Sequence, residues 1–170
     1  MKKFTSITPE ELDPVFDRIG KDWMLISAAD GDRANTMTAS WGGLGVLWNR
    51  PVAFCFIRPE RFTCPMVEAS THLTLSFLPS VYREALSYCG SHSGREGDKF
   101  AAAGLTCVRT EGGVPYPEQA ELVLVCRKLY ADRLSADSFC DPAIKERFYG
   151  QAGGLHRLFI CEIEQVLREV

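Results

Sequence analysis

Apolar runs separated by short polar turns extend along most of the chain. Residues 23–30, WMLISAAD, form such a run; a DGDR turn follows, and residues 34–43, ANTMTASWGG, are predicted to return as its hairpin partner. Residues 52–58, VAFCFIR, are continuously apolar, which indicates a buried strand. Further strands are predicted at residues 72–79, 106–110, 121–134 and 154–167.

Short helices are predicted between these strands. The first, residues 8–20, opens with Thr8 as a capping hydroxyl, Pro9 at the first helical position and Glu11 three residues after the cap. The second, residues 62–71, is predicted to use Thr63 as its cap, with a proline in its first turn. The remaining helices are predicted at residues 81–90, 99–105 and 140–150.

Residues 42–51, GGLGVLWNRP, are predicted to be a loop, because the segment is rich in glycine and is halted by Pro51. The strands and helices do not alternate regularly, as they would in a parallel sheet. Long strands joined by turns favour an antiparallel barrel, which removes exposed sheet edges by closing. The expected fold is therefore mainly β with short helices, an antiparallel barrel formed by one domain of residues 1–170.

Charge and hydropathy exclude two classes of partner. Nineteen Lys and Arg against 22 Asp and Glu give a net charge of −3, so the basic field of a nucleic-acid binder is missing. No apolar run reaches the ~20 residues of a membrane span, and the start MKKFTSITPEE lacks the apolar region of a signal peptide. We therefore expect neither a nucleic-acid nor a membrane partner, and a cytoplasmic location.

Seven cysteines and three histidines raise the question of a metal. The cysteines form no CxxC pair and the histidines have no zinc-ligand spacing, so no metal site is expected. We expect the cysteines to be reduced, and several of them to be small buried apolar residues.

Three segments concentrate polar residues, and the first is NTMTASW, residues 35–41. In a strand, Asn35, Met37, Ala39 and Trp41 share one face, while Thr36, Thr38 and Ser40 share the other. Side chains this small would let a flat ligand approach the backbone N–H and C=O groups of the strand. The alternative is an edge strand with a polar face toward solvent.

The other two segments are RPERFT, residues 58–63, and SHSGREGDKF, residues 91–100. Guanidinium groups beside a helix start form an anion site suited to phosphate. Glycines in the last segment would let the backbone approach a ligand closely. The alternative is solvated surface charge and an ordinary loop. The candidate phosphate-binding residues are Arg58, Arg61, Thr63, Ser91, Ser93 and Lys99.

Together these segments resemble the flavin reductase-like family of FMN-binding split barrels, which includes the flavoredoxins. The most specific matches are NTMTASW, RPERFT and SGREGDKFAAAGL, and GGLHRLFICEI is similar to the closing strand of the family. The resemblance implies a six-stranded antiparallel split barrel that acts as a homodimer with FMN near the subunit interface. It also implies a cofactor site that joins the phosphate-binding residues to a ring-binding strand comprising Asn35, Met37, Thr38, Ala39, Ser40 and Trp41.

Three functions remain open from the sequence. The first is an NAD(P)H-dependent flavin reductase, in which the flavin carries the chemistry and no catalytic acid or base is needed. The second is a flavoredoxin-like carrier that exchanges electrons with a protein partner and uses no nicotinamide. The third is a ligand-binding barrel without redox activity. No catalytic side chain is identified, which is expected for either flavin-dependent function.

Overall fold

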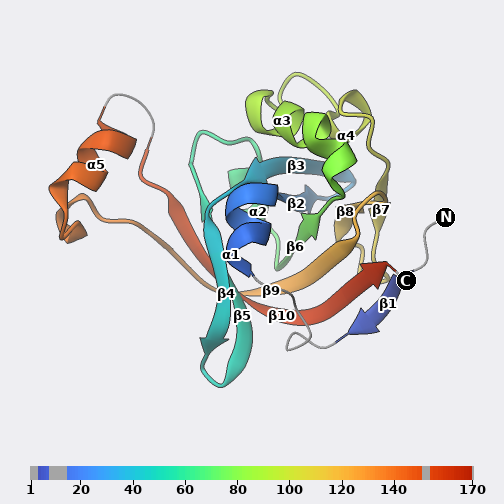
Figure 1. Ribbon diagram of the computed structural model, residues 1–170, viewed down its shortest axis with the longest axis horizontal. Coiled ribbons are helices and arrows are strands. Elements are labelled where there is room, and N and C mark those ends of the chain that lie inside the picture. The colour runs from blue at the N-terminus through green and yellow to red at the C-terminus, as the bar shows by residue number, and fades with distance from the viewer. Residues whose placement is uncertain (1–3, 8–14, 151–153, 170) are drawn as a thin grey trace.

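The computed structural model describes residues 4–7, 15–150 and 154–169 (Figure 1). Its main sheet has eight strands, and all the pairings between them are antiparallel. Along the sheet the order is β3-β2-β6-β9-β10-β5-β4, and β1 pairs with β10. The strands are β1 Phe4–Ile7, β2 Met24–Asp30, β3 Arg33–Ala39, β4 Gly42–Leu47, β5 Arg50–Ile57, β6 His72–Phe77, β9 Leu122–Arg133 and β10 Arg157–Glu169.

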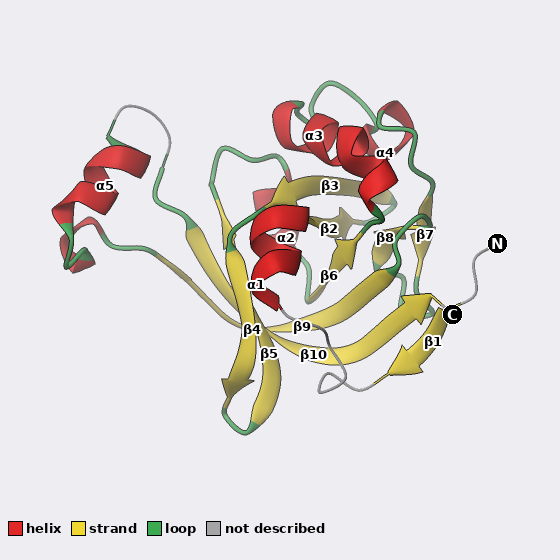
Figure 2. Ribbon diagram, in the orientation of Figure 1, coloured by secondary structure: helices red, strands yellow, loops and turns green. Residues whose placement is uncertain are grey.

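The longest strand, β10, determines the shape of the sheet (Figure 2). One edge of β10 pairs with β9 along nearly its whole length. The other edge is shared: β5 pairs with residues 157–162, and β1 pairs with residues 166–169. The antiparallel split barrel predicted from the sequence is confirmed, although eight strands rather than six belong to the main sheet.

Short helices cover the sheet, and only α5 lies away from it (Figure 2). Helix α2 packs on β2 and β3, while α3 and α4 pack on β3. None of the residues of α5 is buried. The helical segments are α1 Val15–Asp17, the π-helix η2 Arg18–Asp22, α2 Thr63–Ala69, the 3₁₀ turn η3 Ser80–Tyr82, α3 Arg83–Ser91, α4 Lys99–Ala102, the 3₁₀ turn η4 Ala136–Ser138 and α5 Pro142–Tyr149.

The core has two parts, one on each side of the sheet. Alternation along β2 divides its side chains: Ile26 packs with the barrel interior and α2, whereas Leu25 packs with Leu86 of α3 and Phe100 of α4. Burial on both faces explains why this strand is almost continuously apolar in the sequence. Within the described residues, no helix has the length and apolar character needed to cross a membrane.

The loop predicted at residues 42–51 is wrong. Residues 42–47 form β4, which pairs with β5 and gives the hairpin that projects downward in Figure 1. Gly42 is needed here, because a Cβ at this position would meet the carbonyl oxygen of Phe54 at 2.8 Å. Gly45 lies against the Phe54 ring. In this hairpin the aromatic ring of one strand covers the glycines of the other, a pairing that glycine content alone does not reveal.

The helix predictions are only partly correct. Thr63 is not a cap, because Phe62 precedes the helix without a side-chain hydrogen bond and Thr63 itself is helical. The predicted capping residues Thr8, Pro9 and Glu11 lie outside the described residues, and the helical segment continues past Gly20 to Asp22. A short strand that was not predicted, β8 Pro115–Pro117, pairs with β7 Cys107–Arg109.

Candidate functional site

Two adjoining cavities lie where β3, the start of α2, the end of α3 and the start of α4 meet. The larger holds about 600 Å³ and the smaller about 160 Å³, and both are lined by Met37, Arg58 and Arg61. The larger is also lined by Glu60, Phe62, Thr63, Ser91, His92, Ser93, Gly94, Arg95 and Lys99. The smaller is also lined by Thr38, Ala39, Ser40, Trp41, Phe56 and His156. The structure thus brings the predicted ring-binding and phosphate-binding residues together, with Asn35 as the one exception.

Residues 37–41, at the end of β3 and directly after it, line the smaller cavity. Thr38 donates a hydrogen bond from Oγ1 to the backbone oxygen of Leu86, which fixes the strand against α3. Gly90 of α3 lies close to the same residue, since a Cβ on Gly90 would be 3.4 Å from Cβ of Thr38. Small side chains along this strand therefore serve two purposes: they admit α3 on one side and leave a cavity on the other.

Cations surround the larger cavity. Lys99 donates from Nζ to the backbone oxygen of Cys89 (2.6 Å), and Arg61 donates from Nη1 to that of Gly90 (2.5 Å). Both acceptors lie in the last turn of α3, where the helix dipole favours positive charge. Arg58 donates from Nη2 to the backbone oxygen of Phe148 (2.7 Å). Each guanidinium has five N–H donors and can hold more than one acceptor at a time.

The ammonium group of Lys99 is unusually placed. Its side chain is only 5% exposed, and burial lowers its pKa, with the nearby Arg61 charge lowering it further. Among the described residues, no carboxylate forms an ion pair with Lys99. A buried cation that faces a cavity without a counter-charge is unfavourable unless an anion enters.

The two predicted serines form local hydrogen bonds, Ser91 at the end of α3 and Ser93 in the loop that follows. Ser91 donates from Oγ to the backbone oxygen of Ser87 (2.9 Å), and Oγ of Ser93 accepts from the backbone N–H of Arg95 (3.2 Å). Gly94 packs tightly beneath them, because a Cβ there would clash with the side-chain oxygen of Asn35 and would lie 2.6 Å from the ring of Phe62. The loop can approach the strand only because this residue is glycine.

Asn35 lies behind the cavity wall. It is 2% exposed and donates from Nδ2 to Oγ1 of Thr63 (2.8 Å), which is 1% exposed. The bond joins β3 to the first turn of α2. Asn35 is therefore placed to hold the wall of the site together rather than to line it.

Several residues of the site were not predicted from the sequence. Phe62 has the guanidinium of Arg33 over its ring at 4.4 Å and that of Arg95 at 5.4 Å. Arg33 donates to the backbone oxygen of Gly94, and Arg95 donates to that of Glu60. These two cations therefore bind the loop after α3 and the loop before α2 on either side of the ring. The RPERFT segment contained this aromatic residue, but its stacking depends on arginines from elsewhere in the chain.

His156 is buried at the edge of the smaller cavity. Its Nδ1 shares a hydrogen bond of 2.7 Å with the hydroxyl of Tyr149, and its ring lies 5.2 Å from that of Trp41. Burial, together with the charges of Arg58 and Arg61, lowers the pKa of His156 to about 4. The imidazole is therefore neutral at physiological pH.

The end of α5 also reaches this site. Phe148 contacts Trp41 edge to face, with ring centroids 5.2 Å apart, and Tyr149 lies under the guanidinium of Arg58 at 5.2 Å. Helix α5 begins at Pro142 after the capping carboxylate of Asp141, as its sequence suggests. Its contribution to the site could not be inferred from sequence, because it depends on how the chain returns to the sheet.

All seven cysteines are free thiols, and only Cys107 and Cys140 are exposed. Burial raises the pKa of Cys64 and of Cys89 to about 11, so both thiols near the site stay protonated at neutral pH. In the ranges that the structure describes, no three His, Cys, Asp or Glu side chains gather as a metal site would require.

Comparisons with known proteins give a family match and several similar solved structures. The model of the flavin reductase like domain family matches residues 16–169. No protein of curated function matches the sequence significantly. Among solved structures, the chain is similar to an FMN-binding domain of a flavin reductases-like enzyme from Shewanella baltica, with a TM-score of 0.72 and 15% identity over 99% of this chain and 78% of that one.

Two further structures have related descriptions. Flavoredoxin from Methanosarcina acetivorans has a TM-score of 0.69 and 19% identity, over 87% of this chain and 68% of that one. The NADH:FAD oxidoreductase of Streptomyces globisporus, solved with NAD and FAD fragments, has a TM-score of 0.65 and 19% identity, over 95% of this chain and 85% of that one. At these identities the similarity establishes a common fold.

Proposed function

The chain belongs to the flavin reductase-like domain family, and on that premise we propose that it is an FMN-binding oxidoreductase. In this proposal residues 1–170 form a single flavin-binding domain. NADH or NADPH delivers a hydride to the bound flavin, and the electrons then pass to a second acceptor. The flavin supplies the redox chemistry, and the protein supplies binding, orientation and electrostatics.

The observation that carries the proposal is the buried charge of Lys99. Its ammonium group lines the larger cavity, is 5% exposed and has no carboxylate partner among the described residues. Arg58 and Arg61 line the same cavity. A phosphate monoester bears up to two negative charges, which this group of cations would neutralise. Ser91 and Ser93 line the same cavity and would offer hydroxyl groups to the phosphate.

The smaller cavity suits the flavin ring system. It shares three lining residues with the larger one, and residues 37–41 and Phe56 line it. A planar ring could stack on an aromatic side chain and exchange hydrogen bonds with the strand backbone. The two cavities together have the order that FMN requires, with the phosphate among cations and the ring along a strand of small residues.

Hydride transfer needs no acid or base from the protein. The histidine that lines the smaller cavity is neutral, which fits that expectation. His156 is neutral and is oriented by Tyr149, so it can form a hydrogen bond but contributes no charge. Its burial beside Trp41 also excludes water from this edge of the cavity.

The alternative is a flavoredoxin-like electron carrier, which would bind the same flavin and use a protein donor instead of a nicotinamide. One observation favours it: exposed aromatic groups flank the site, with Trp41 43% and Phe148 36% exposed. Such groups could receive a redox partner. They could equally be covered in a homodimer, which we propose as the functional state because the tip of the β4–β5 hairpin also exposes Val46 and Trp48.

A visible absorption titration tests the proposal. Purified protein is titrated with FMN, and NADH or NADPH is then added without oxygen. Saturable flavin uptake followed by bleaching supports the reductase. Uptake with bleaching only by dithionite supports the electron carrier, and absence of uptake by wild-type protein would overturn both.

A further inference from the structure

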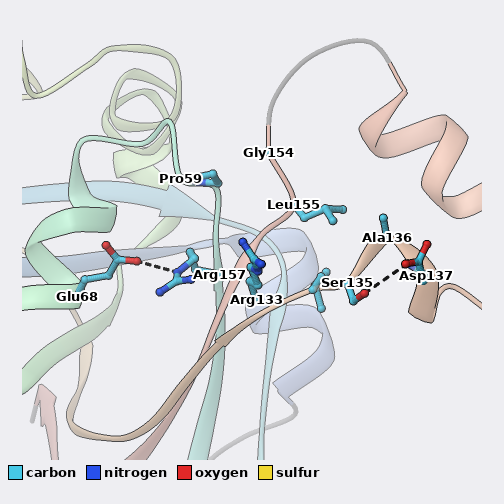
Figure 3. Close-up of a pocket in the computed structure, with 10 residues that line it drawn as sticks. Pro59, Glu68, Arg133, Ser135, Ala136, Asp137, Gly154, Leu155 and Arg157 are labelled. Carbon is cyan, nitrogen blue, oxygen red and sulfur yellow. Dashed lines mark hydrogen bonds and ion pairs between the residues drawn. The ribbon is translucent and has the colours of Figure 1, made fainter.

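A third cavity, of about 650 Å³, lies beside the connection from β9 to β10 (Figure 3). This volume is in the range of sites for small organic ligands. Its walls come from the end of β9, the residues before β10 and the residue after Arg58 in the loop that follows β5. It shares no lining residue with the two cavities assigned to the flavin.

Strand alternation separates this cavity from the flavin site. Along β10, Arg157 continues the core-facing row of Phe159 and Cys161, both fully buried. The preceding residue, His156, lines the smaller flavin cavity. Consecutive residues also line different cavities after β5: Arg58 lines the flavin cavities and Pro59 lines the third one. An arginine therefore occupies the last position of a row that is otherwise apolar.

A second arginine lies opposite the first. Arg133 of β9 is the direct antiparallel partner of Arg157, and Figure 3 shows the two side chains next to one another. Like charges directly opposite on neighbouring strands are destabilising unless something compensates them. The pair therefore needs a negative group, from the protein or from a ligand.

The protein places carboxylates near both arginines, but among the described residues only Arg157 forms an ion pair. Hydrogen bonds from the Tyr130 hydroxyl and the backbone N–H of Arg133, together with the charges of the two arginines, lower the pKa of Asp132, whose carboxylate is held by those hydrogen bonds. Nε of Arg157 lies 2.7 Å from a carboxylate oxygen of Glu68, although the N–H is not aligned for a hydrogen bond. Over the part of the chain that is described, no side chain forms an ion pair or a hydrogen bond with the guanidinium of Arg133. Asp137 is the other carboxylate in the lining, and no contact of its carboxylate with either arginine is formed.

The rest of the lining is largely apolar. Leu134, Leu155, Ala136 and Pro59 provide hydrocarbon surface, and Ser135 provides a hydroxyl. Oγ of Ser135 accepts a hydrogen bond from the backbone N–H of Asp137 (3.4 Å) and keeps its own proton to donate. The cavity thus combines two guanidinium groups and one hydroxyl donor with an apolar wall.

We propose that this cavity binds a small organic oxyanion, a carboxylate or phosphate group carried on an apolar body. The oxyanion lies between Arg133 and Arg157, and the apolar body lies against Leu134 and Leu155. None of its lining residues lines the flavin cavities, although Gly154 donates a hydrogen bond to Glu60 of the larger one. Guanidinium groups suit either oxyanion, since both accept paired N–H donors.

The test is a titration of ¹⁵N-labelled protein with phenyl phosphate, benzoate, inorganic phosphate and the neutral analogue benzyl alcohol. The amide signals of Leu134, Ser135 and Leu155 report on this cavity and separate it from Arg58, Arg61 and Lys99. We expect these signals to shift saturably with phenyl phosphate or benzoate and not with benzyl alcohol. The tighter of the two anions identifies the preferred oxyanion. Equal responses to benzyl alcohol, or shifts confined to the flavin site, would overturn the proposal.

Two variants should change the affinity for the anion in opposite directions. Arg133→Gln should weaken binding about tenfold or more, through loss of a charge-assisted contact. Glu68→Gln should tighten it up to about fivefold, because the carboxylate that competes for Arg157 is removed. Lys145→Gln, on α5 outside the cavity, removes the same charge as Arg133→Gln and should leave affinity unchanged. Equal weakening by Lys145→Gln and Arg133→Gln would show only a general effect of charge.

Discussion

Asn35 donates a hydrogen bond of 2.8 Å to Oγ1 of Thr63, and both side chains are almost completely buried. The bond connects β3, which borders the smaller cavity, to α2, which begins beside the larger one. Each residue looks like a ligand-binding group in the sequence. In the fold they bond to one another and join β3 to the start of α2.

We expect Asn35→Ala to destabilise the protein by about 1–3 kcal/mol, because it leaves the buried Thr63 hydroxyl without its donor. Urea unfolding followed by circular dichroism measures the change. The matched control is Ser87→Ala, an exposed hydroxyl on α3 whose loss should cost little. In the double variant with Thr63→Val the two losses should be less than additive. Strict additivity would mean that the bond contributes no coupling.

Lys99→Met should affect ligand binding much more than stability. The affinity for FMN should fall roughly 10- to 100-fold, since a charge-assisted contact to the phosphate is lost. Without flavin, the free energy of unfolding should change little, because removing a desolvated cation that has no carboxylate partner among the described residues offsets the loss of its hydrogen bond to the Cys89 carbonyl. Flavin fluorescence quenching and urea unfolding provide the two measurements, with Lys145→Met as control. Unchanged FMN affinity in Lys99→Met, or in Arg58→Ala combined with Lys99→Ala, would exclude this phosphate site.

Burial of His156 should make stability sensitive to acid. The folded-state pKa is about 4, against 6.5 for the free side chain, so the unfolded chain binds more protons between these values. Stability is therefore lost as the pH falls from about 6.5 toward 4, by roughly 3 kcal/mol at most from this group. His156→Gln, which does not titrate, should flatten this part of the curve. Parallel curves for the two proteins would show that His156 is not responsible.

Gly94→Ala should displace the loop of residues 91–95. The added Cβ would clash with Asn35 and Phe62, so the loop must move away from the cavity. We expect a loss of about 1–3 kcal/mol in stability, as for overpacking elsewhere, together with weaker FMN binding. Gly20→Ala is the matched control, because a Cβ there meets no atom within 4 Å. A Gly94→Ala protein with wild-type stability and affinity would mean that the loop does not depend on this contact.

Replacing Trp48 with lysine tests the proposed homodimer. Trp48 is 54% exposed at the tip of the β4–β5 hairpin, so the substitution should be tolerated by the monomer fold and should disfavour an interface there. Sedimentation equilibrium compares the mass of the variant with that of the wild type. The proposal fails if wild-type protein is monomeric at micromolar concentration.

The sequence by itself determined the periodic parts of the fold. Alternating and continuous apolar runs predicted β2, β3, β5, β6, β9 and β10, because the faces that a strand buries determine which of its successive residues are apolar. It failed at β4, where glycines suit a hairpin only because the Phe54 ring on the neighbouring strand covers them. Hydrophobic pattern reports what one segment buries, whereas β4 depends on its partner.

The residues of the candidate site also fall into those predicted from the sequence and those found only in the structure. Short polar segments predicted Met37 to Trp41 and the cations that line the two cavities, because these residues are concentrated in contiguous stretches. Only the tertiary structure added His156 and Phe148, and paired Arg133 with Arg157. Arg58 and Phe148, for example, are separated by 90 residues. Contacts over such distances are created when β10 returns to pair with β5 and β9, and the register of that return is a property of the whole sheet rather than of any local sequence.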